Sequence, residues 1–486
     1  MERNNFFSIL EENVFKDCSG EIVEIETGVR ISYKKLYEEV LLWSFFFKQF
    51  TQKIICVILP NSVDYLKVLF SANLTRNIFN PIPYFVEIQE LNKVFKYVCP
   101  EVIVTDRDDI IKTYENDYSI IDTRVVDLKE AVPDDALSFK SVESDIAALY
   151  YSSGTTGNPK GVLYSNKNMV SLIGSIVREF GFDSKTSHLA FLPFGHTASI
   201  NYNILPAFYC GASLYISRGF ECLRTSFFKM LSKYNIGYTE VIPTVVFMLN
   251  KLNLKTGNLN LKNLRFIGCG SSTLPLSAQK EFIDKYKIPL ANLYGLSETG
   301  PSHIDNPSKE GWEPGSIGYP LDVNECKISD GGEILLKGDN VFVGYYKNKE
   351  LYKEVVRDGW FYTGDLGYVR NKKFYFADRK KDLIVKGGIN IIPMEIEEII
   401  FSIPEVHETV VVGKDHKMLG EKIVAVVTLK ENAGDNNIKG KIKEVCKKSL
   451  SNYKVPEEIY VWDSIPKTHS GKLLRKKVRE EINKES

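Results

Sequence analysis

A run of small residues, hydroxyls and one lysine marks the segment from Tyr150 to Val162, which reads YYSSGTTGNPKGV. Its glycines allow backbone N–H groups to approach a polyphosphate, its hydroxyls can donate hydrogen bonds, and its lysine adds a positive charge. The pattern predicts a phosphate-binding loop. The loop consists of Ser152, Ser153, Gly154, Thr155, Thr156, Gly157 and Lys160.

The spacing in this loop differs from that of P-loop nucleotidases, in which a serine or threonine follows the lysine directly. Here Gly161 follows Lys160. A flexible surface loop is the alternative interpretation of any glycine-rich run. A strand-like run (146–151) precedes the loop, and Ser165 or Asn166 can cap a following helix. This context favours a binding site.

Four further motifs follow the loop in order along the chain. They are NLYGLSETG (292–300), GWFYTGDLGYV (359–369), DRKKDLIVKGGINIIPMEIEEI (378–399) and YKVPEEIYVWDSIPKTHSGKLLRK (453–476). Together the five segments resemble the signature motifs of the adenylate-forming superfamily, and in particular its acyl-CoA synthetase branch. The resemblance implies ATP-dependent activation of a carboxylic acid to an acyl adenylate, release of pyrophosphate, and transfer of the acyl group to a thiol. ATP, Mg²⁺ and CoA are the implied cofactors and substrates.

Adenylation brings two anions together, so cations and hydroxyls are needed where charge builds on the phosphoryl oxygens. The resemblance assigns the Mg²⁺ ligand to Glu298, a hydrogen bond to the α-phosphate to Ser297, and the catalytic cation to Lys472. Superfamily members more often carry threonine at the position of Ser297. Lys472 would bridge the acyl carboxylate and the α-phosphate, a task suited to a flexible ammonium.

The nucleotide itself is expected to contact a second group of residues. Tyr294 offers a ring for adenine, Asp365 lies in an expected turn and can accept from the ribose hydroxyls, and Arg379 adds a cation. A core role for Tyr294, a plain turn role for Asp365 and a pairing of Arg379 with a nearby aspartate are the alternatives. The full set is Gly270, Ser271, Ser272, Asn292, Tyr294, Gly295, Asp365 and Arg379.

The tail of the chain is expected to rotate between two poses about the hinge residue Lys381, as the resemblance implies. In the second pose Lys472 leaves, and Gly387 and Gly388 line the passage for a pantetheine thiol. Glycines suit a narrow passage because they carry no side chain. A simple turn is the alternative, and Ile389 departs from the usual pattern at this rim.

The segment LPFGHT (192–197) resembles the acyl-pocket segment of the superfamily, which makes His196 and Thr197 the predicted pocket residues. Amino-acid adenylating domains place an aspartate nearby to pair with the substrate ammonium. No acidic residue occurs between Asp183 and Glu221, and a buried ammonium without a partner is costly. We therefore expect a fatty, aryl or other acid with an uncharged chain.

Three functions other than that of an acyl-CoA synthetase are alternatives for this set of motifs. An acyl-AMP ligase that loads the phosphopantetheine of an acyl carrier protein shares all five motifs, but the C-terminal match favours CoA. A silent ATP-binding scaffold would be expected to have lost Lys160, Glu298 or Lys472, and the chain retains all three. Luciferase-like oxidation depends only on a particular substrate and oxygen, so the motifs leave it open.

Positioning these residues requires alternating strands and helices. Short apolar runs, among them 54–59, 101–105, 264–267 and 290–293, alternate with helical segments such as 62–74. We expect a large α/β domain of layered sheets and helices over residues 1–380, followed by a small mobile α+β domain over residues 381–486. A basic run from Lys467 to Arg479 is expected to be mostly a solvated helical face.

Composition limits the possible partners. Lys plus Arg and Asp plus Glu both number 62, so no global field exists to attract nucleic acid. The eight cysteines are scattered singly, which indicates reduced thiols and predicts a cytoplasmic protein. No run approaches the roughly 18 apolar residues of a membrane span. Small molecules are the expected partners, with an acyl carrier protein as a possible addition.

Overall fold

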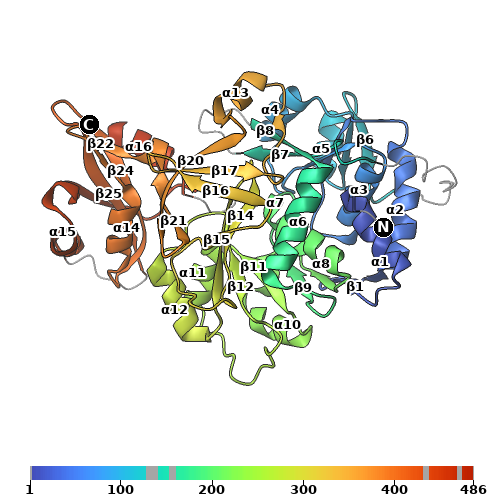
Figure 1. Cartoon of the computed structure of the whole chain (residues 1–486), viewed down its shortest axis with the longest axis horizontal. Helices are drawn as coiled ribbons and strands as arrows, with labels where there is room; N and C mark the ends of the chain where they lie inside the picture. The colour runs from blue at the N-terminus through green and yellow to red at the C-terminus, as the bar shows by residue number, and fades with distance from the viewer. Residues whose placement is uncertain (1–2, 127–140, 153–159, 431–436, 468–472, 485–486) are drawn as a thin grey trace.

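The first sheet forms around buried parallel strands in the N-terminal part of the chain (Figure 1). The structure, a computed structural model, describes residues 3–126, 141–152, 160–430, 437–467 and 473–484. The strand order is β18-β8-β7-β4-β3-β5-β6. These strands are β3 (Ile54–Ile58), β4 (Ile78–Pro81), β5 (Val102–Thr105), β6 (Ser119–Asp122), β7 (Ile146–Ser152), β8 (Lys160–Ser165) and β18 (Gly344–Tyr345). The linking helices are α3 (Val63–Leu74), α4 (Ile88–Val98) and α5 (Asp108–Tyr114).

The second sheet has the order β15-β14-β13-β12-β11-β9-β10-β1-β2. Its strands are β1 (Glu21–Glu24), β2 (Arg30–Ser32), β9 (His188–Ala190), β10 (Leu214–Ile216), β11 (Tyr238–Val241), β12 (Ile267–Cys269), β13 (Leu290–Leu296), β14 (Gly300–Asp305) and β15 (Tyr319–Pro320). Helices and the π-helix η3 precede, connect or follow these strands along the chain. They are α1 (Phe6–Phe15), α2 (Tyr33–Phe47), α6 (Asn166–Phe180), α7 (Thr197–Ser199), η3 (Ile200–Ile204), α8 (Leu205–Cys210), α9 (Phe220–Leu223), α10 (Phe227–Lys233), α11 (Pro243–Lys251) and α12 (Leu276–Tyr286).

Helix α6 joins these two sheets, because it contacts β7 and β8 of the first and β14 of the second. It begins where the sequence predicts, since the Ser165 hydroxyl accepts from the Asn168 N–H in a capping box. The predicted strand over 264–267 is displaced, and β12 begins only at Ile267. Leu264 is buried in the core without pairing to a neighbouring strand.

A third, antiparallel sheet lies between the body and the C-terminal part. It contains β16 (Asn324–Ile328), β17 (Glu333–Gly338), β19 (Val356–Arg357), β20 (Trp360–Arg370) and β21 (Lys373–Arg379), with α13 (Lys349–Val355) beside it. The register of β17 and β20 shifts at Thr363–Asp365, where these three residues stand opposite one residue of β17. The expected turn at Asp365 is therefore a bulge inside a long strand, which re-aims the side chain.

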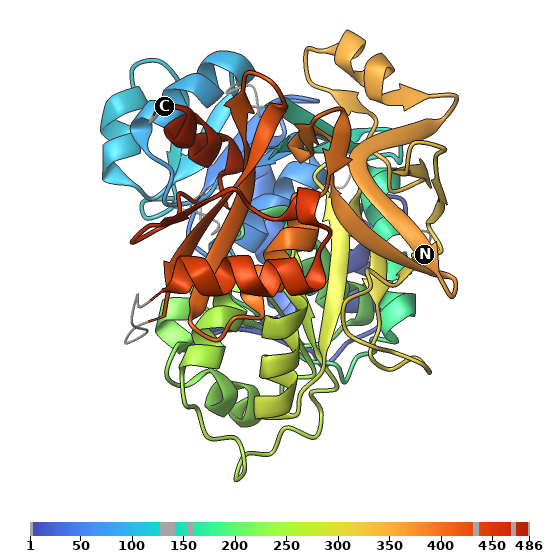
Figure 2. The same cartoon turned by 90° about the vertical axis from the view of Figure 1, so that its left-hand side faces the viewer.

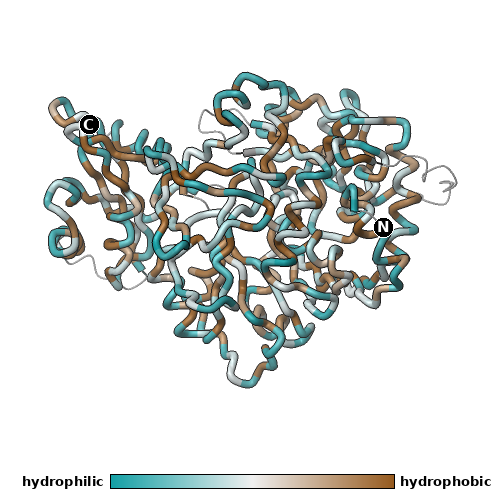
Figure 3. Tube along the Cα trace, viewed as in Figure 1, coloured by the Kyte–Doolittle hydropathy of each residue, from teal (hydrophilic) through white to brown (hydrophobic). Residues whose placement is uncertain are grey.

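The C-terminal part forms its own sheet, of order β23-β22-β25-β24 with β26 added to β25. Figure 1 shows it at the left, and Figure 2 shows it facing the viewer. Apolar residues follow its inner strands (Figure 3). Its elements are η4 (Lys380–Asp382), β22 (Ile384–Lys386), β23 (Ile389–Ile391), α14 (Pro393–Phe401), β24 (Val406–His416), β25 (Gly420–Leu429), α15 (Ile438–Ser449), η5 (Asn452–Lys454), β26 (Glu458–Val461) and α16 (Arg475–Lys484).

The predicted fold class, a large α/β body of layered sheets followed by a small α+β unit, is confirmed. Within the ranges described above, none of the helices combines the length and the apolar character that crossing a bilayer requires.

Two contacts of α14 link the small unit to the body. The Leu276 N–H at the start of α12 donates to both carboxylate oxygens of Glu398 at 3.3 Å. Phe247 of α11 stacks on Phe401 of α14, with ring centroids 6.3 Å apart and an interplanar angle of 13°. A carboxylate is a favourable cap for the N-terminus of a helix. This side-chain cap and this ring pair therefore help to hold the observed orientation.

Arg475 departs from the solvated face that the basic run predicts. Its guanidinium donates to both oxygens of Glu397 and to the Val411 carbonyl. Glu397 is itself only 7% exposed and also accepts from the Val411 N–H. This buried pair joins α16, which directly follows the motif containing Lys472, to α14 and β24.

We predict that Arg475→Met destabilises the small unit by about 3–5 kcal/mol, because it leaves the Glu397 carboxyl buried without its cation. Urea unfolding followed by the fluorescence of Trp462 measures the change. Arg479→Met is the matched control on the same helix, where the arginine is 42% exposed, and it is expected to cost no more than about 1 kcal/mol. Equal losses in the two variants would contradict the buried pair.

Candidate active site

A cleft of about 1230 Å³ opens where the first three sheets meet. This volume exceeds the roughly 300–1,000 Å³ of a typical small-molecule site, which leaves room for a nucleotide and a second ligand. Residues from β8, the segment before α7, β13, β20 and η4 line it. The cleft brings together these predicted residues: Lys160, His196, Thr197, Ser271, Gly295, Ser297, Glu298, Asp365, Arg379 and Lys381.

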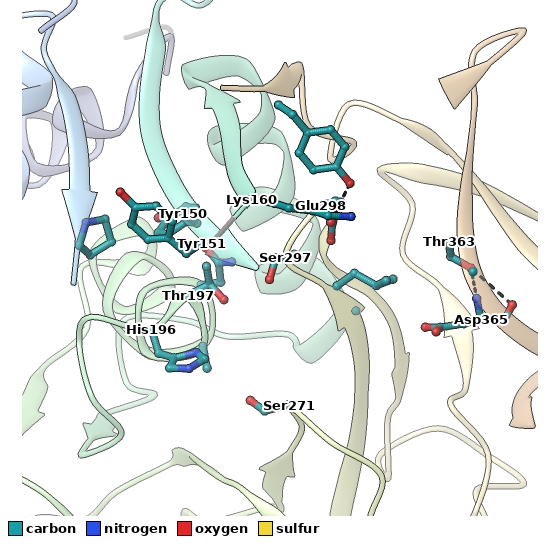
Figure 4. Close-up of a pocket in the computed structure, with 18 of the residues that line it drawn as sticks. Tyr150, Tyr151, Lys160, His196, Thr197, Ser271, Ser297, Glu298, Thr363 and Asp365 are labelled. Carbon is teal, nitrogen blue, oxygen red and sulfur yellow. Dashed lines mark hydrogen bonds between the residues drawn. The ribbon is translucent and has the colours of Figure 1, made fainter. Parts of the chain in front are cut away.

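Lys160 and Glu298 occupy the middle of the cleft (Figure 4). The Tyr345 hydroxyl donates to a carboxylate oxygen of Glu298 at 2.9 Å, and the Lys160 ammonium lies 5.9 Å from the centroid of the same tyrosine ring. The Tyr164 hydroxyl donates to the Ser297 carbonyl at 2.8 Å. Two tyrosines from the first sheet therefore fix the segment from β13 that carries the predicted metal ligand.

Asp365 lies at another end of the cleft, on the bulge in β20 (Figure 4). One carboxylate oxygen accepts from the Tyr294 hydroxyl at 2.9 Å, and the other lies 3.4 Å from Arg379 Nε. The Thr363 hydroxyl accepts from the Asp365 N–H. Arg379 thus pairs with Asp365 rather than with an aspartate next to it in sequence, and the two predicted nucleotide residues meet.

Positive charge gathers where η4 enters the cleft. Partial desolvation and the charges of Arg379 and Lys160 lower the pKa of Lys381. Lys380 lies 3.3 Å from Glu333, which also accepts from the Gly364 N–H. Cations that destabilise one another favour the binding of a polyanion, because its charge relieves their repulsion.

His196 and Thr197 line the opposite side of the cleft from Asp365 (Figure 4). Asn201 and Tyr202 of η3 continue this wall, and Ser271 faces it from the end of β12. Ser271 has a left-handed backbone, with φ of +71°. π-Helical segments such as η3 occur frequently at functional sites.

Other predicted residues lie outside the lining of the cleft or outside the described residues. Tyr294 packs against His303 and Phe376 while its hydroxyl orients Asp365. Asn292 donates to the Ser316 carbonyl. Gly270 and Ser272 flank Ser271. Ser152 ends β7, where it pairs with Lys160 of β8. The described ranges omit Ser153, Gly154, Thr155, Thr156, Gly157 and Lys472.

Gly387 and Gly388 form the two-residue turn between β22 and β23, with φ of +57° and +81°. Positive φ at both positions is typical of a type I′ hairpin turn and explains two adjacent glycines locally. Neither residue lines the cleft in the observed orientation of the small unit.

The cleft offers oxygen donors to a metal ion. Glu298 supplies a carboxylate and Ser297 a hydroxyl, and such hard donors suit Mg²⁺. No cluster of three or more histidine, cysteine, aspartate or glutamate side chains occurs among the residues that the structure describes. The donors fit an ion that takes most of its ligands from phosphate oxygens and water, as Mg²⁺ commonly does.

Comparisons with known proteins agree with this geometry. Residues 10–346 match the AMP-binding enzyme family, and residues 395–472 match the AMP-binding enzyme C-terminal domain. The chain belongs to the AMP-binding enzyme family. It is an AMP-forming acid–thiol ligase of the adenylate-forming superfamily, which forms an acyl adenylate from a carboxylic acid and ATP and transfers the acyl group to CoA.

A 2-succinylbenzoate–CoA ligase of Listeria innocua is 34% identical over 339 residues, which is 69% of this chain and 70% of that protein. A long-chain-fatty-acid–CoA ligase of Bacillus subtilis is 33% identical over 70% of this chain and 62% of its own. The o-succinylbenzoate CoA synthetase of Bacillus subtilis with its acyl-adenylate intermediate superimposes with a TM-score of 0.83 at 24% identity. That superposition covers 99% of this chain and 98% of the other, and shows a shared fold.

Tyr345 is a site residue that sequence reasoning missed. It lies on β18, far along the chain from both Lys160 and Glu298, and reaches them because β18 pairs with β8. A tyrosine in an ordinary apolar context carries no sequence signal. Its hydroxyl positions the Glu298 carboxylate, and burial together with that carboxylate raises its pKa, so it stays a neutral donor.

We predict that Tyr345→Phe raises the Mg²⁺ concentration needed for half-maximal adenylation and slows this step by roughly tenfold, because Glu298 loses a neutral hydrogen-bond donor. Glu298→Gln should change both quantities in the same direction and by more. Pyrophosphate–ATP exchange over a Mg²⁺ titration measures both. The control is Tyr346→Phe, which loses a hydroxyl that donates to the Val98 carbonyl. An unchanged Mg²⁺ dependence in Tyr345→Phe would remove its positioning role.

Proposed function

We propose that this enzyme activates a fatty, aryl or other acid with an uncharged chain, using Mg²⁺-ATP, and that CoA rather than a carrier protein accepts the acyl group. The proposal rests on one observation, which is that the predicted acid, phosphate and ribose residues lie in three successive parts of the cleft. His196 and Thr197 lie on one side, Lys160 and Glu298 in the middle, and Asp365 on the other side (Figure 4).

This division matches the order of the reacting groups. The acid lies along His196 and Thr197, and its carboxylate points to the middle of the cleft. Asp365, held by Tyr294 and Arg379, accepts the ribose hydroxyls. The α-phosphate then lies beside Ser297, and Lys160 with the loop before it holds the leaving pyrophosphate. Mg²⁺ bound through Glu298 supplies charge neutralisation on the phosphate oxygens.

The acid's carboxylate attacks the α-phosphorus in line, and pyrophosphate leaves. Cations placed on both sides lower the repulsion between the two anions and stabilise the charge of the transition state. Lys472 supplies the cation that bridges the carboxylate and the α-phosphate. In the second half-reaction the CoA sulfur attacks the acyl carbon, and AMP is the leaving group.

Rotation of the small unit about Lys381 separates the two half-reactions in this proposal. Lys381 lies in η4, between β21 of the third sheet and β22 of the fourth, where backbone changes can turn one sheet relative to the other. The rotation withdraws Lys472 and brings the Gly387–Gly388 turn to the thiol passage. That turn presents no side chain.

We predict that Lys472→Ala abolishes acyl-AMP formation but leaves thioester formation from supplied acyl-AMP nearly intact. Gly388→Trp should do the reverse, because an indole blocks the passage of a thiol. Separate assays of the two half-reactions measure both effects. Gly311→Trp is the matched control, since this glycine also has a positive φ and open space around it but lies away from the cleft. Loss of both half-reactions in a folded Lys472→Ala variant would contradict the two poses.

For the acid, we predict that aliphatic or aryl acids support pyrophosphate–ATP exchange and that common α-amino acids give only background. Thr197→Asp should depress exchange with the native acid, because it adds an unpaired charge to the pocket at a cost of several kcal/mol. Robust exchange with an α-amino acid by the unmodified enzyme would overturn the proposed acid class.

A further inference from the structure

A carboxyl group is buried in β11 without a partner. Glu240 is 1% exposed, and neither of its carboxyl oxygens has a hydrogen-bond partner among the residues that the structure describes. A buried polar group without a partner costs about 1–3 kcal/mol. Such a cost is unusual in a strand that is otherwise part of the core, and it calls for a partner that the protein itself does not supply.

Glu240 lies directly behind the wall of the cleft. A Cβ atom added at Gly270, the residue before Ser271, would lie 3.1 Å from Leu293 Cβ and 3.4 Å from Glu240 Oε1, so the carboxyl packs beside the backbone of Gly270. Burial and, in second place, the nearby Glu240 carboxyl raise the pKa of Tyr202. Ser271 and Tyr202 both line the cleft. The carboxyl therefore lies behind the part of the wall that Ser271 and Tyr202 form.

Tyr238, two residues before Glu240 on β11, also has a buried hydroxyl without a hydrogen-bond partner in the described ranges. His188, on the neighbouring strand β9, packs against the Tyr238 ring. Burial lowers the pKa of His188 to about 3 and raises that of Glu240. Both groups are therefore neutral near pH 7, and the Glu240 carboxyl can donate one hydrogen bond while its other oxygen accepts one.

We infer that Glu240 determines acid specificity by accepting a hydrogen bond from a hydroxyl or aromatic amino group at the end of the acid farthest from its reacting carboxylate. The inference rests on the proposed placement of the acid along His196 and Thr197. It refines the acid class, because the chain stays uncharged but carries a donor at its inner end. No acidic residue occurs between Asp183 and Glu221. Glu240 lies outside this part of the sequence, on β11.

A site built to hydrogen-bond a substrate hydroxyl rejects an analogue without it, since the protein group is then left buried and unpaired. An acid with the donor should therefore be preferred over its unsubstituted counterpart by at least about tenfold in kcat/KM. The methyl ether of the same acid loses the donor but keeps an oxygen that can accept from the Glu240 carboxyl, so it should fall between the unsubstituted and the hydroxylated acid.

The test uses the full-length enzyme and matched sets of benzoic, cinnamic and straight-chain acids, each unsubstituted, hydroxylated and methoxylated at the distal end, with amino derivatives of the two aromatic acids. Pyrophosphate–ATP exchange gives kcat/KM, and calorimetry with the corresponding acyl-sulfamoyl adenosines gives affinity without turnover. We expect Glu240→Leu to abolish the preference for the donor in both measurements and to keep the KM for ATP. Glu240→Gln retains an acceptor and should keep much of the preference.

Asp305→Asn is the control for the loss of a buried carboxyl, because Asp305 lies in β14 of the same sheet and outside the lining of the cleft. It should leave the preference unchanged. A wild-type enzyme without a preference for the donor would overturn the inference, as would a Glu240→Leu variant that keeps the wild-type ratio within twofold. Exchange with none of the acids, in contrast, would refute the proposed acid class, while the affinities of the adenosine analogues would still decide the role of Glu240.

Discussion

The Asp365 carboxylate joins the parts of the molecule that must meet for the cleft to exist. It is 3% exposed, and a charge so buried needs partners on several sides. Tyr294 reaches it from the second sheet, Arg379 from the last strand before the small unit, and the β20 bulge turns it inward. This end of the cleft, the third sheet and the entry to η4 therefore depend on one group.

The same rule, that a buried charge must be paired, organises the small unit. Glu397 and Arg475 tie the first helix of this unit to its last. Asp378, buried at the end of the third sheet, accepts from the Met394 N–H at the start of α14. Arg475, three residues after Lys472 in sequence, thus anchors the start of α16 to α14.

Local patterns predicted the fold well where one residue type decides the structure. The Ser165 cap, the helix predicted over 62–74 and the alternation of strands and helices follow from spacing alone. Contacts between distant segments carried no such signal. Tyr345 reaches Glu298 through strand pairing, Arg475 is buried only because Glu397 faces it, and the Asp365 bulge arises from a register shift. In the sequence, Glu240 is noticeable only as an acid inside an apolar strand. Its proposed role follows from its position beside Gly270 and near Tyr202 in the fold.

The cap that Glu398 places on α12, together with the ring pair of Phe247 and Phe401, has a thermodynamic consequence. A hydrogen bond to a charged group and an aromatic pair contribute about 1.5–3 and 0.5–1.5 kcal/mol, and 1.4 kcal/mol is a tenfold change in a population. These contacts can bias the orientation of the small unit but cannot lock it. If the small unit rotates as proposed, a ligand that binds one orientation a few hundredfold more tightly than the other outweighs these contacts and sets the population of each orientation.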